Sequence, residues 1–333
     1  MNNKTLFKGH SSDVNSVGFN HDGTLIVSGS SDQTVRIWNV DSGKCIRVLK
    51  GHSKSVNSVG FNHNGTLIVS GSDDGTIRLW NVKTGKLVNT LEDQTKGVTS
   101  VVFNHDGTKI LSGSRDKTLR VWNVLTGECD LKLENRTVMA FNHDSKYIFT
   151  DNLEDCLIHV FDMETEQVID TFNNEYGGSI CSLVLSRDGK KILCGSHHSD
   201  RDYNDYYNIS VFDSDNGDLI KSFEDGIRGN HIEICDKTIG QKKKEAEDFI
   251  GGDPCINIAL NHDGTKVVST PDVSNEFTRI WDLNTYQCIL RLPTVSLSLE
   301  DIPSIKSVGF NHNGTKIVTG FDKYIRVCDI EEN

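Results

Sequence analysis

Short apolar stretches, separated by polar turns, run along most of the chain. In residues 14–49 they cover Val14–Phe19, Leu25–Ser28, Thr34–Val40 and Cys45–Leu49. Val, Ile and Thr dominate these stretches, which is typical of short β-strands. The gaps between them carry Gly, Asp, Ser and Asn, the usual turn residues. No window shows a sustained apolar period of about 3.6 residues, so the pattern predicts strands and excludes a helical solenoid.

This pattern of four stretches repeats. The segment Phe-Asn-His-Asp-Gly-Thr at residues 19–24 returns at Phe61 and at Phe103, a step of 42 residues each time. Weaker copies begin at Phe141, Leu185, Leu260 and Phe310. The first strands of the seven copies are expected to start near residues 14, 56, 98, 137, 180, 255 and 305. Four strands per copy is the composition of a propeller blade, so we expect an all-β chain that forms one seven-bladed β-propeller over residues 1–333.

The two ends of the chain complement each other. The last copy supplies only three strands and ends at Tyr324–Ile330. The N-terminal segment Thr5–His10 resembles Val48–His52, which contains the end of a fourth strand. We therefore expect residues 4–10 to pair into the seventh blade and close the ring, because an open ring would leave strand edges exposed to aggregation.

The motifs inside the copies resemble those of the WD40 family of β-propellers. That family carries a Gly-His pair, a Ser-Gly-Ser-x-Asp turn and a Trp-Asp or Trp-Asn pair that ends the third strand. The first copy has Gly9-His10, Ser28–Asp32 and Trp38-Asn39, and the second has Gly51-His52, Ser70–Asp74 and Trp80-Asn81. The third copy keeps the turn and the Trp, but Gln94 replaces the His.

The resemblance implies a buried hydrogen-bonded tetrad inside each of the first two blades. Its expected members are His10, Ser28, Asp32 and Trp38 in blade 1, and His52, Ser70, Asp74 and Trp80 in blade 2. A His-Ser-Asp set resembles a catalytic triad. Because the same set recurs from blade to blade, which an active site does not, we interpret it as structural and predict no catalytic residues.

The repeated Asn-His-Asp-Gly turns raise the question of a metal site. Six equivalent histidines occupy these turns: His21, His63, His105, His143, His262 and His312. With one histidine per blade around a rim, we expect them to lie too far apart to meet within the 2.0–2.1 Å bonds of one zinc ion. A role as turn residues is favoured, and a second hypothesis is that the ring titrates between pH 5 and 8 and affects partner binding.

Other motifs of active or metal sites are missing or weak. There is no phosphate-binding GxxxxGK[ST] loop, nucleophile elbow or HExxH pattern. The nearest approach to a metal cluster is His197-His198 with Asp200, Asp202 and Asp205, in a polar, Tyr-rich insertion that we interpret as a solvated loop. The sequence predicts no metal and no cofactor.

Composition narrows the functional classes. The net charge of −12 disfavours binding to nucleic acid, and the one basic run, Lys242–Lys244, is followed at once by acidic residues. No apolar run is long enough for a transmembrane helix, and the N-terminus lacks the apolar region of a secretory signal. Nine scattered cysteines favour a reducing compartment, so we expect a cytoplasmic or nuclear protein that is neither secreted nor transmembrane.

Function in a propeller is expected on loops at the ends of its central channel. In WD40 proteins two kinds of position line the usual contact face. The residue four before the Phe of each copy gives Asn15, Asn57, Thr99, Thr137, Cys181, Ile256 and Lys306. The residue before the turn Asp gives Ser31, Asp73, Arg115 and Glu154. The mapped positions are polar and small in blades 1–3, without the aromatic anchors of a deep peptide slot.

Two insertions interrupt the repeat. The larger occupies residues 224–254, between blades 5 and 6, and carries Ile232, Ile234 and Phe249. The smaller lies in blade 5 and adds Tyr203, Tyr206 and Tyr207. We expect both to project from one face. Aromatic and aliphatic loop residues are candidates for gripping a partner, although either loop could instead cover its own blade.

Taken together, the fold and the resemblance predict a non-catalytic scaffold or adaptor that is monomeric by itself and assembles other proteins into a complex. Small-molecule binding is not expected. The alternative is a propeller that binds phosphoinositides at a membrane surface, which should show a basic rim. An enzyme would need convergent carboxylates or metal ligands outside the repeated positions, and the sequence offers no such set.

Overall fold

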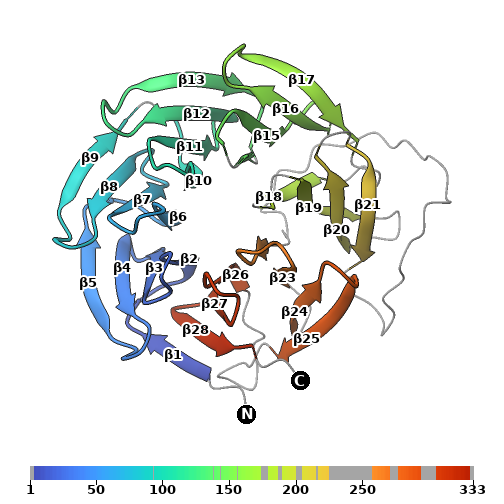
Figure 1. The fold of residues 1–333 in the computed structure, drawn as a ribbon. Coiled ribbons are helices and arrows are strands. Elements are labelled where there is room, and N and C mark those ends of the chain that lie inside the picture. The colour runs from blue at the N-terminus through green and yellow to red at the C-terminus, as the bar shows by residue number, and fades with distance from the viewer. Residues whose placement is uncertain are drawn as a thin grey trace.

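The seven-bladed β-propeller expected from the repeat is confirmed. The computed structural model describes residues 4–92, 94–137, 139–142, 144–155, 157–173, 179–186, 190–199, 205–214, 217–224, 257–270, 277–293 and 305–330. Within those ranges every regular element is a β-strand, and the strands form seven four-stranded antiparallel sheets arranged as blades around a central axis (Figure 1). The described residues form no helix long and apolar enough to cross a membrane.

Blades 1–3 are the most regular. Blade 1 consists of β2 (Val14–Phe19), β3 (Leu25–Ser30), β4 (Thr34–Asn39) and β5 (Cys45–Lys50). Blade 2 consists of β6 (Val56–Phe61), β7 (Leu67–Ser72), β8 (Ile77–Asn81) and β9 (Leu87–Leu91). Blade 3 consists of β10 (Val98–Phe103), β11 (Lys109–Ser114), β12 (Thr118–Asn123) and β13 (Cys129–Glu134). The first strand of each blade lies nearest the axis and the fourth forms the outer wall (Figure 1).

Blades 4–6 follow the same order with less regular strand lengths. Blade 4 consists of β14 (Met139–Phe141), β15 (Tyr147–Asp151), β16 (Ile158–Asp162) and β17 (Gln167–Phe172). Blade 5 consists of β18 (Ser179–Leu185), β19 (Lys191–Ser199), β20 (Asp205–Asp213) and β21 (Leu219–Glu224). Blade 6 consists of β22 (Asn257–Leu260), β23 (Lys266–Thr270), β24 (Phe277–Asp282) and β25 (Gln287–Pro293).

Blade 7 joins the two ends of the chain, as predicted. Its sheet order is β1 (Lys4–Lys8), β28 (Tyr324–Asp329), β27 (Lys316–Phe321) and β26 (Ile305–Phe310). The N-terminal strand β1 is antiparallel to β28, in a register that pairs Phe7 with Ile325. Phe7 is 1% exposed and meets the Trp38 ring edge-on at 6.0 Å, so the closing strand also contacts blade 1.

The hydrophobic core lies between the blades. Each of seven clusters of buried residues joins two adjacent sheets around the ring. Between blades 1 and 2, Val27 and Ile37 pack in one cluster with Val56. A Cβ at Gly29 would lie 2.7 Å from a Val56 methyl carbon, so the approach of the next blade requires glycine there. Side chains that alternate between the two faces of a sheet therefore pack against the two neighbouring blades.

The smaller insertion differs from the expected loop. Strands β19 and β20 both run three residues beyond the usual six, and His197 pairs with Tyr207 in their register. The interpretation of this segment as a solvated loop is thus wrong for the backbone of His197, His198 and Asp205. Aromatic residues favour strands, and the paired Tyr206 and Tyr207 extend the hairpin despite its polar composition.

The candidate docking residues mostly fall outside the described part of the chain. Tyr203 and the side chains of Tyr206 and Tyr207 are not described. The same holds for Ile232, Ile234 and Phe249 in the larger insertion, of which only Glu224, at the end of β21, is described.

Candidate functional site

The tetrad residues of blades 1 and 2 are bonded to one another inside their blades. In blade 1, the His10 ring contacts Asp32 through Nδ1 at 2.7 Å and Ser28 Oγ through Nε2 at 2.7 Å. Trp38 Nε1 donates to the same Ser28 Oγ at 2.8 Å. The corresponding distances among His52, Asp74, Ser70 and Trp80 are 2.9, 2.8 and 2.8 Å.

These networks are buried and anchor the loop that leads into each blade. Ser28 and Ser70 are fully buried, and the His10 and His52 residues are 5% and 6% exposed. Burial alone raises the pKa of Asp74. Hydrogen bonds from the His52 ring, the Ser53 amide and Thr76 outweigh this effect and hold the pKa well below its ordinary 3.8. A serine buried in this way is held by Trp and His and does not face a substrate.

Blade 4 has a network that sequence reasoning missed. Its histidine comes from the third strand: His159 Nε2 contacts Asp155 Oδ2 at 2.9 Å, and its Nδ1 lies 3.2 Å from the Arg136 guanidinium. Thr137, expected on the contact face, donates from Oγ1 to Asp151 Oδ2 at 2.6 Å. Arg136 and His159 stand at positions where blades 1 and 2 have His and Arg, and a search for a fixed motif does not detect this swap.

On the face where the inner strands begin, polar side chains form a continuous network of contacts over three blades. Asn15 Nδ2 donates to Ser31 Oγ and to Ser55 Oγ, both at 3.0 Å. Ser55 Oγ donates to Asn57 Oδ1 at 3.2 Å, and Asn57 Nδ2 donates to Asp73 Oδ1 at 2.8 Å. We call the set that these contacts join the polar face: Asn15, Ser31, Ser55, Asn57, Asp73 and Arg115.

Arg115 is the most exposed member of the polar face. Its guanidinium lies 3.3 Å from Asp73 Oδ1, and its side chain is 62% exposed, against 28% for Asp73. Ser55 was missed from the sequence, although it stands two residues before Asn57, as Asp13 does before Asn15. These bonds hold the amide and carboxylate groups in place, while the Arg115 head remains accessible to a partner.

Three further expected face residues lie at the same end of the strands but do not join this network, and Ile256 lies outside the described residues. Thr99 is exposed at the start of β10. Lys306 Nζ contacts Asp13 Oδ2 at 2.7 Å, which links blade 7 to blade 1. Glu154 Oε1 accepts a bond from Asn135 Nδ2 at 2.7 Å. These groups line the face as separate polar contacts.

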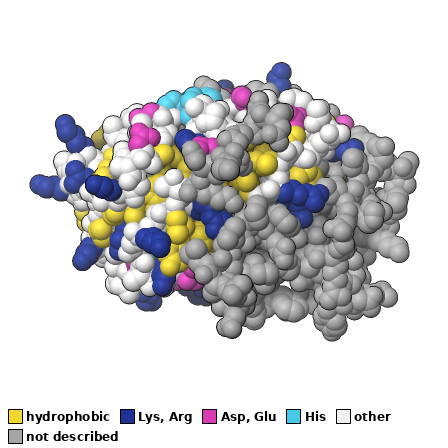
Figure 2. Space-filling view, turned by 90° about the horizontal axis from the view of Figure 1, so that it is seen from below, with side chains coloured by type: hydrophobic (Ala, Val, Ile, Leu, Met, Phe, Trp, Pro, Cys, Tyr) yellow, Lys and Arg dark blue, Asp and Glu magenta, His cyan; other side chains and the backbone are white. Residues whose placement is uncertain are grey.

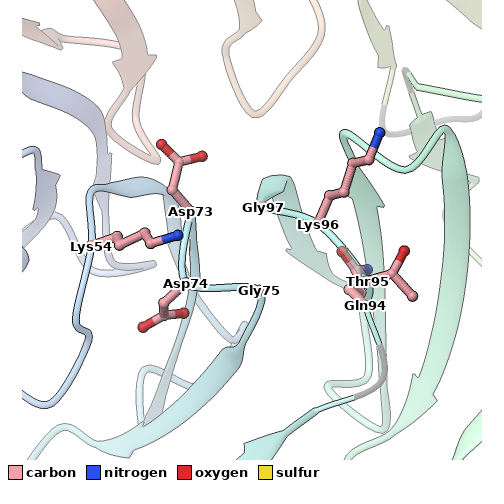
Figure 3. Close-up of a pocket in the computed structure, with 8 residues that line it drawn as sticks. All are labelled: Lys54, Asp73, Asp74, Gly75, Gln94, Thr95, Lys96 and Gly97. Atoms are coloured by element: carbon pink, nitrogen blue, oxygen red, sulfur yellow. The ribbon is translucent and has the colours of Figure 1, made fainter.

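A polar hollow of about 340 Å³ opens next to the polar face, between blades 2 and 3. Lys54, Asp73 and Asp74 line one wall, while Gln94, Thr95 and Lys96 line the other (Figure 3). Its lining contains no aromatic or aliphatic side chain, and ammonium and carboxylate groups are mixed. The hollow therefore offers hydrogen-bonding and charged groups but no apolar floor.

The histidine turns lie at the opposite face, because β2 begins at the polar face and ends at the turn that carries His21. Five of the six histidines are described, and each ring lies 3.7–4.5 Å, centroid to centroid, from the next. The expectation that these positions stay widely separated around a rim is wrong for them. The turns extend toward the axis, so side chains from successive blades converge.

The fold and the tetrads define a propeller built from WD-type repeats. Residues 2–39, 43–81 and 85–123 match the family model described as "WD domain, G-beta repeat". These matches lie in the first three blades, and together with the seven-bladed ring they confirm the resemblance to WD40-repeat propellers.

Named relatives are similar over single repeats. WD repeat-containing protein 18 of Homo sapiens is 48% identical over 44 residues, which cover 13% of this chain and 10% of that protein. The ribosome biogenesis protein BOP1 homolog of Oryza sativa subsp. japonica is 50% identical over 42 residues, 13% of this chain and 6% of the relative. The chain thus spans a tenth or less of the length of these relatives.

Proposed function

We propose that this chain is a non-catalytic scaffold that binds other proteins on the polar face and assembles them into a complex. The observation that supports this most directly is the hydrogen-bonded chain from Asn15 to Asp73, which ends at the exposed Arg115. Protein interaction is typical of WD40 propellers, and Arg is enriched among residues that dominate binding energy.

The form of the face favours a protein partner over a small molecule. Its groups are spread over three blades, with Arg115 exposed and the others half-exposed, so a ligand must be broad to contact them together. The adjacent hollow is polar and lacks an apolar floor, whereas small-molecule sites are mostly apolar and concave. Because Asn15 and Asn57 are already held in place by hydrogen bonds, a partner would lose little entropy in ordering them.

The names of the relatives suggest where to seek the partner. Three of the similar proteins are named as ribosome biogenesis proteins, from Oryza sativa subsp. japonica, Monosiga brevicollis and Aedes aegypti. We propose that this chain acts in a nuclear assembly of that kind. Thr99, Thr137, Glu154 and Lys306 would border the contact, and the insertion at residues 224–254 would provide a second docking element.

The test is a charge reversal at Arg115. Arg115→Glu should reduce the recovery of co-purifying proteins from a lysate of the source cells at least tenfold, since loss of a dominant Arg costs about 2 kcal/mol or more. The matched control is Lys132→Glu, which makes the same charge change at a 46% exposed lysine on the outer strand β13. Both variants should melt like the wild type.

A second variant separates the polar face from the insertion. If deletion of residues 225–252 removes the partners while Arg115→Glu retains them, the polar face is not the docking site. If neither change affects the recovered proteins, the proposal fails. The phosphoinositide alternative is favoured instead if the wild type binds phosphoinositide vesicles in a salt-sensitive manner and recovers no protein partner.

A further inference from the structure

Five histidines form a continuous arc at the face opposite to the polar face. In spatial order they are His105, His63, His21, His312 and His262, which belong to blades 3, 2, 1, 7 and 6. Successive ring centroids are 4.5, 4.4, 4.1 and 3.7 Å apart. In the space-filling view, histidine side chains gather in one patch at the edge of the molecule (Figure 2). We call this set the histidine arc.

The turns that carry the arc are built by other residues. The Asn20 side chain accepts a bond from the Leu25 amide at 2.8 Å, and Asp22 accepts one from the Thr24 amide at 2.9 Å. In blade 2, Asn62 and Asn64 make the equivalent bonds. Since these bonds define the turn, its conformation gives no reason for an imidazole at the second position in blade after blade.

We propose that neighbouring imidazoles of the histidine arc bind late first-row divalent metal ions such as Zn²⁺, Ni²⁺ or Cu²⁺. Each ion would be held by two histidines, with water completing its coordination. Imidazole nitrogen is a preferred ligand of these ions and a poor one for Mg²⁺. Within the described ranges, no group of three or more His, Cys, Asp or Glu residues is placed to hold a metal, so the proposal is confined to sites with two histidines.

The spacing of the arc suits such pairs. When two imidazole rings bind the same ion through nitrogen–metal bonds of about 2.0–2.1 Å, and the two bonds form a tetrahedral or right angle, the ring centroids lie roughly 4.5–5.5 Å apart. The rings are now 3.7–4.5 Å apart, so each has to turn or shift by about 1 Å or less. His21, His63 and His105 are exposed and His262 and His312 half-exposed, which leaves room for this movement.

The surrounding charges favour a cation. Asp22, Asp106 and Asp263 follow three of the histidines directly. Asp22 accepts hydrogen bonds from the amide and the hydroxyl of Thr24, which hold its carboxylate on the turn that carries His21. The equivalent positions in blades 2 and 7 are the neutral Asn64 and Asn313. Lys266, whose charge acts on Asp263, opposes this effect in blade 6, and the chain as a whole carries a net charge of −12.

The test is calorimetric titration of the untagged full chain with ZnCl₂ at pH 7.5. The triple variant His21→Gln/His63→Gln/His312→Gln breaks every pair of described arc rings whose centroids lie 3.7–6.0 Å apart, including His21 and His262. Zinc affinity should fall at least tenfold in this variant. The control is Lys132→Gln, which changes a 46% exposed residue on the outer strand β13 and keeps all the rings.

Two further measurements complete the test. Zinc affinity of the wild type should fall tenfold or more between pH 7.5 and pH 5.5, because only neutral imidazole binds a metal. MgCl₂ should give no binding under the same conditions. The proposal is overturned if the wild type does not bind zinc at millimolar concentration, or if the triple variant, shown by its melting curve to be folded, binds zinc as tightly as the wild type.

Discussion

At the scale of the residue, the carboxylates of the tetrads connect stability to pH. The hydrogen bonds that lower the pKa of Asp74 form only in the folded chain. A carboxyl group with a depressed folded pKa stabilises the fold above its unfolded value, near 3.8 here, and this contribution is lost as the pH falls through the lower folded value. Asp32 in blade 1 follows the same rule, with bonds from His10 and Thr34 outweighing its burial.

Replacing one of these carboxylates should therefore have a pH-dependent effect. We predict that Asp74→Asn destabilises the chain at pH 7 by about 1–3 kcal/mol, since a charged partner of His52 and the Ser53 amide is lost. The difference from the wild type should shrink steadily below about pH 4. Urea unfolding midpoints at pH 7, 4 and 3 measure this change.

The control for this prediction is Asp41→Asn, at an exposed position in the turn between β4 and β5. It should leave the midpoint unchanged at each pH. A destabilisation by Asp74→Asn that remains constant down to pH 3 would show that the residue acts through packing and not through its charge.

At the scale of the element, blade 3 shows what an incomplete tetrad costs. Gln94 Nε2 donates to Ser112 Oγ at 2.6 Å, and Trp122 donates to the same oxygen at 2.8 Å. Gln94 Oε1 is buried and makes no hydrogen bond. Asp116, which a histidine would contact, is held instead by Thr118, Thr95 and Arg120, and these bonds outweigh burial and lower its pKa to about 2.

We predict that Gln94→His stabilises the chain by about 0.5–1.5 kcal/mol, because the ring can contact both Ser112 and Asp116 and no orphaned oxygen remains. Thermal unfolding should show a raised midpoint. The reverse change in blade 2, His52→Gln, is the matched comparison and should lower the midpoint of thermal unfolding. A lower midpoint for Gln94→His would mean that the Arg120 contacts to Asp116 already fill the place of the ring.

Much of the blade structure was predictable, for reasons that differ between elements. The strands expected at Val14–Phe19 and Thr34–Val40 appear as β2 (Val14–Phe19) and β4 (Thr34–Asn39), because β-branched runs between Gly and Asp turns leave few alternatives. The extension of β19 and β20 was missed because His197, His198 and Asp205 read as loop residues. In the structure, these histidines pair across the hairpin with Tyr207 and Tyr206, so the segment is strand. No local sequence pattern shows this pairing.

At the scale of the whole molecule, the repeat specifies the order of the blades but not which side chains from different blades come into contact. The polar face could be listed position by position, yet its continuity depends on Ser55 lying within hydrogen-bond distance of both Asn15 and Asn57. The histidines are 42 residues apart in the first three copies, and only the closed ring brings them to within stacking distance. Convergence of this kind depends on the radius and tilt of the blades, which a repeat period does not specify.

Ring closure itself leads to the last prediction. Phe7 lies on β1, is 1% exposed and packs with Val14, Trp38 and Val327, so one side chain joins blade 7 to blade 1. Phe7→Ala should cost about 3–5 kcal/mol, as expected for a large buried side chain, and should lower the thermal midpoint by several degrees. Thr5→Ala changes an exposed residue on the same strand and should melt like the wild type.

Hydrogen exchange can show that this loss acts through closure. In Phe7→Ala the amides of β28, paired with β1, and of β4, which carries Trp38, should exchange faster than in the wild type. Amides of blades 3 and 4 lie across the ring and should change last, because among the described residues each core cluster joins two adjacent blades (Figure 1). Uniform acceleration in all blades would instead mean that the ring opens as a single cooperative unit, with no weak point at its closure.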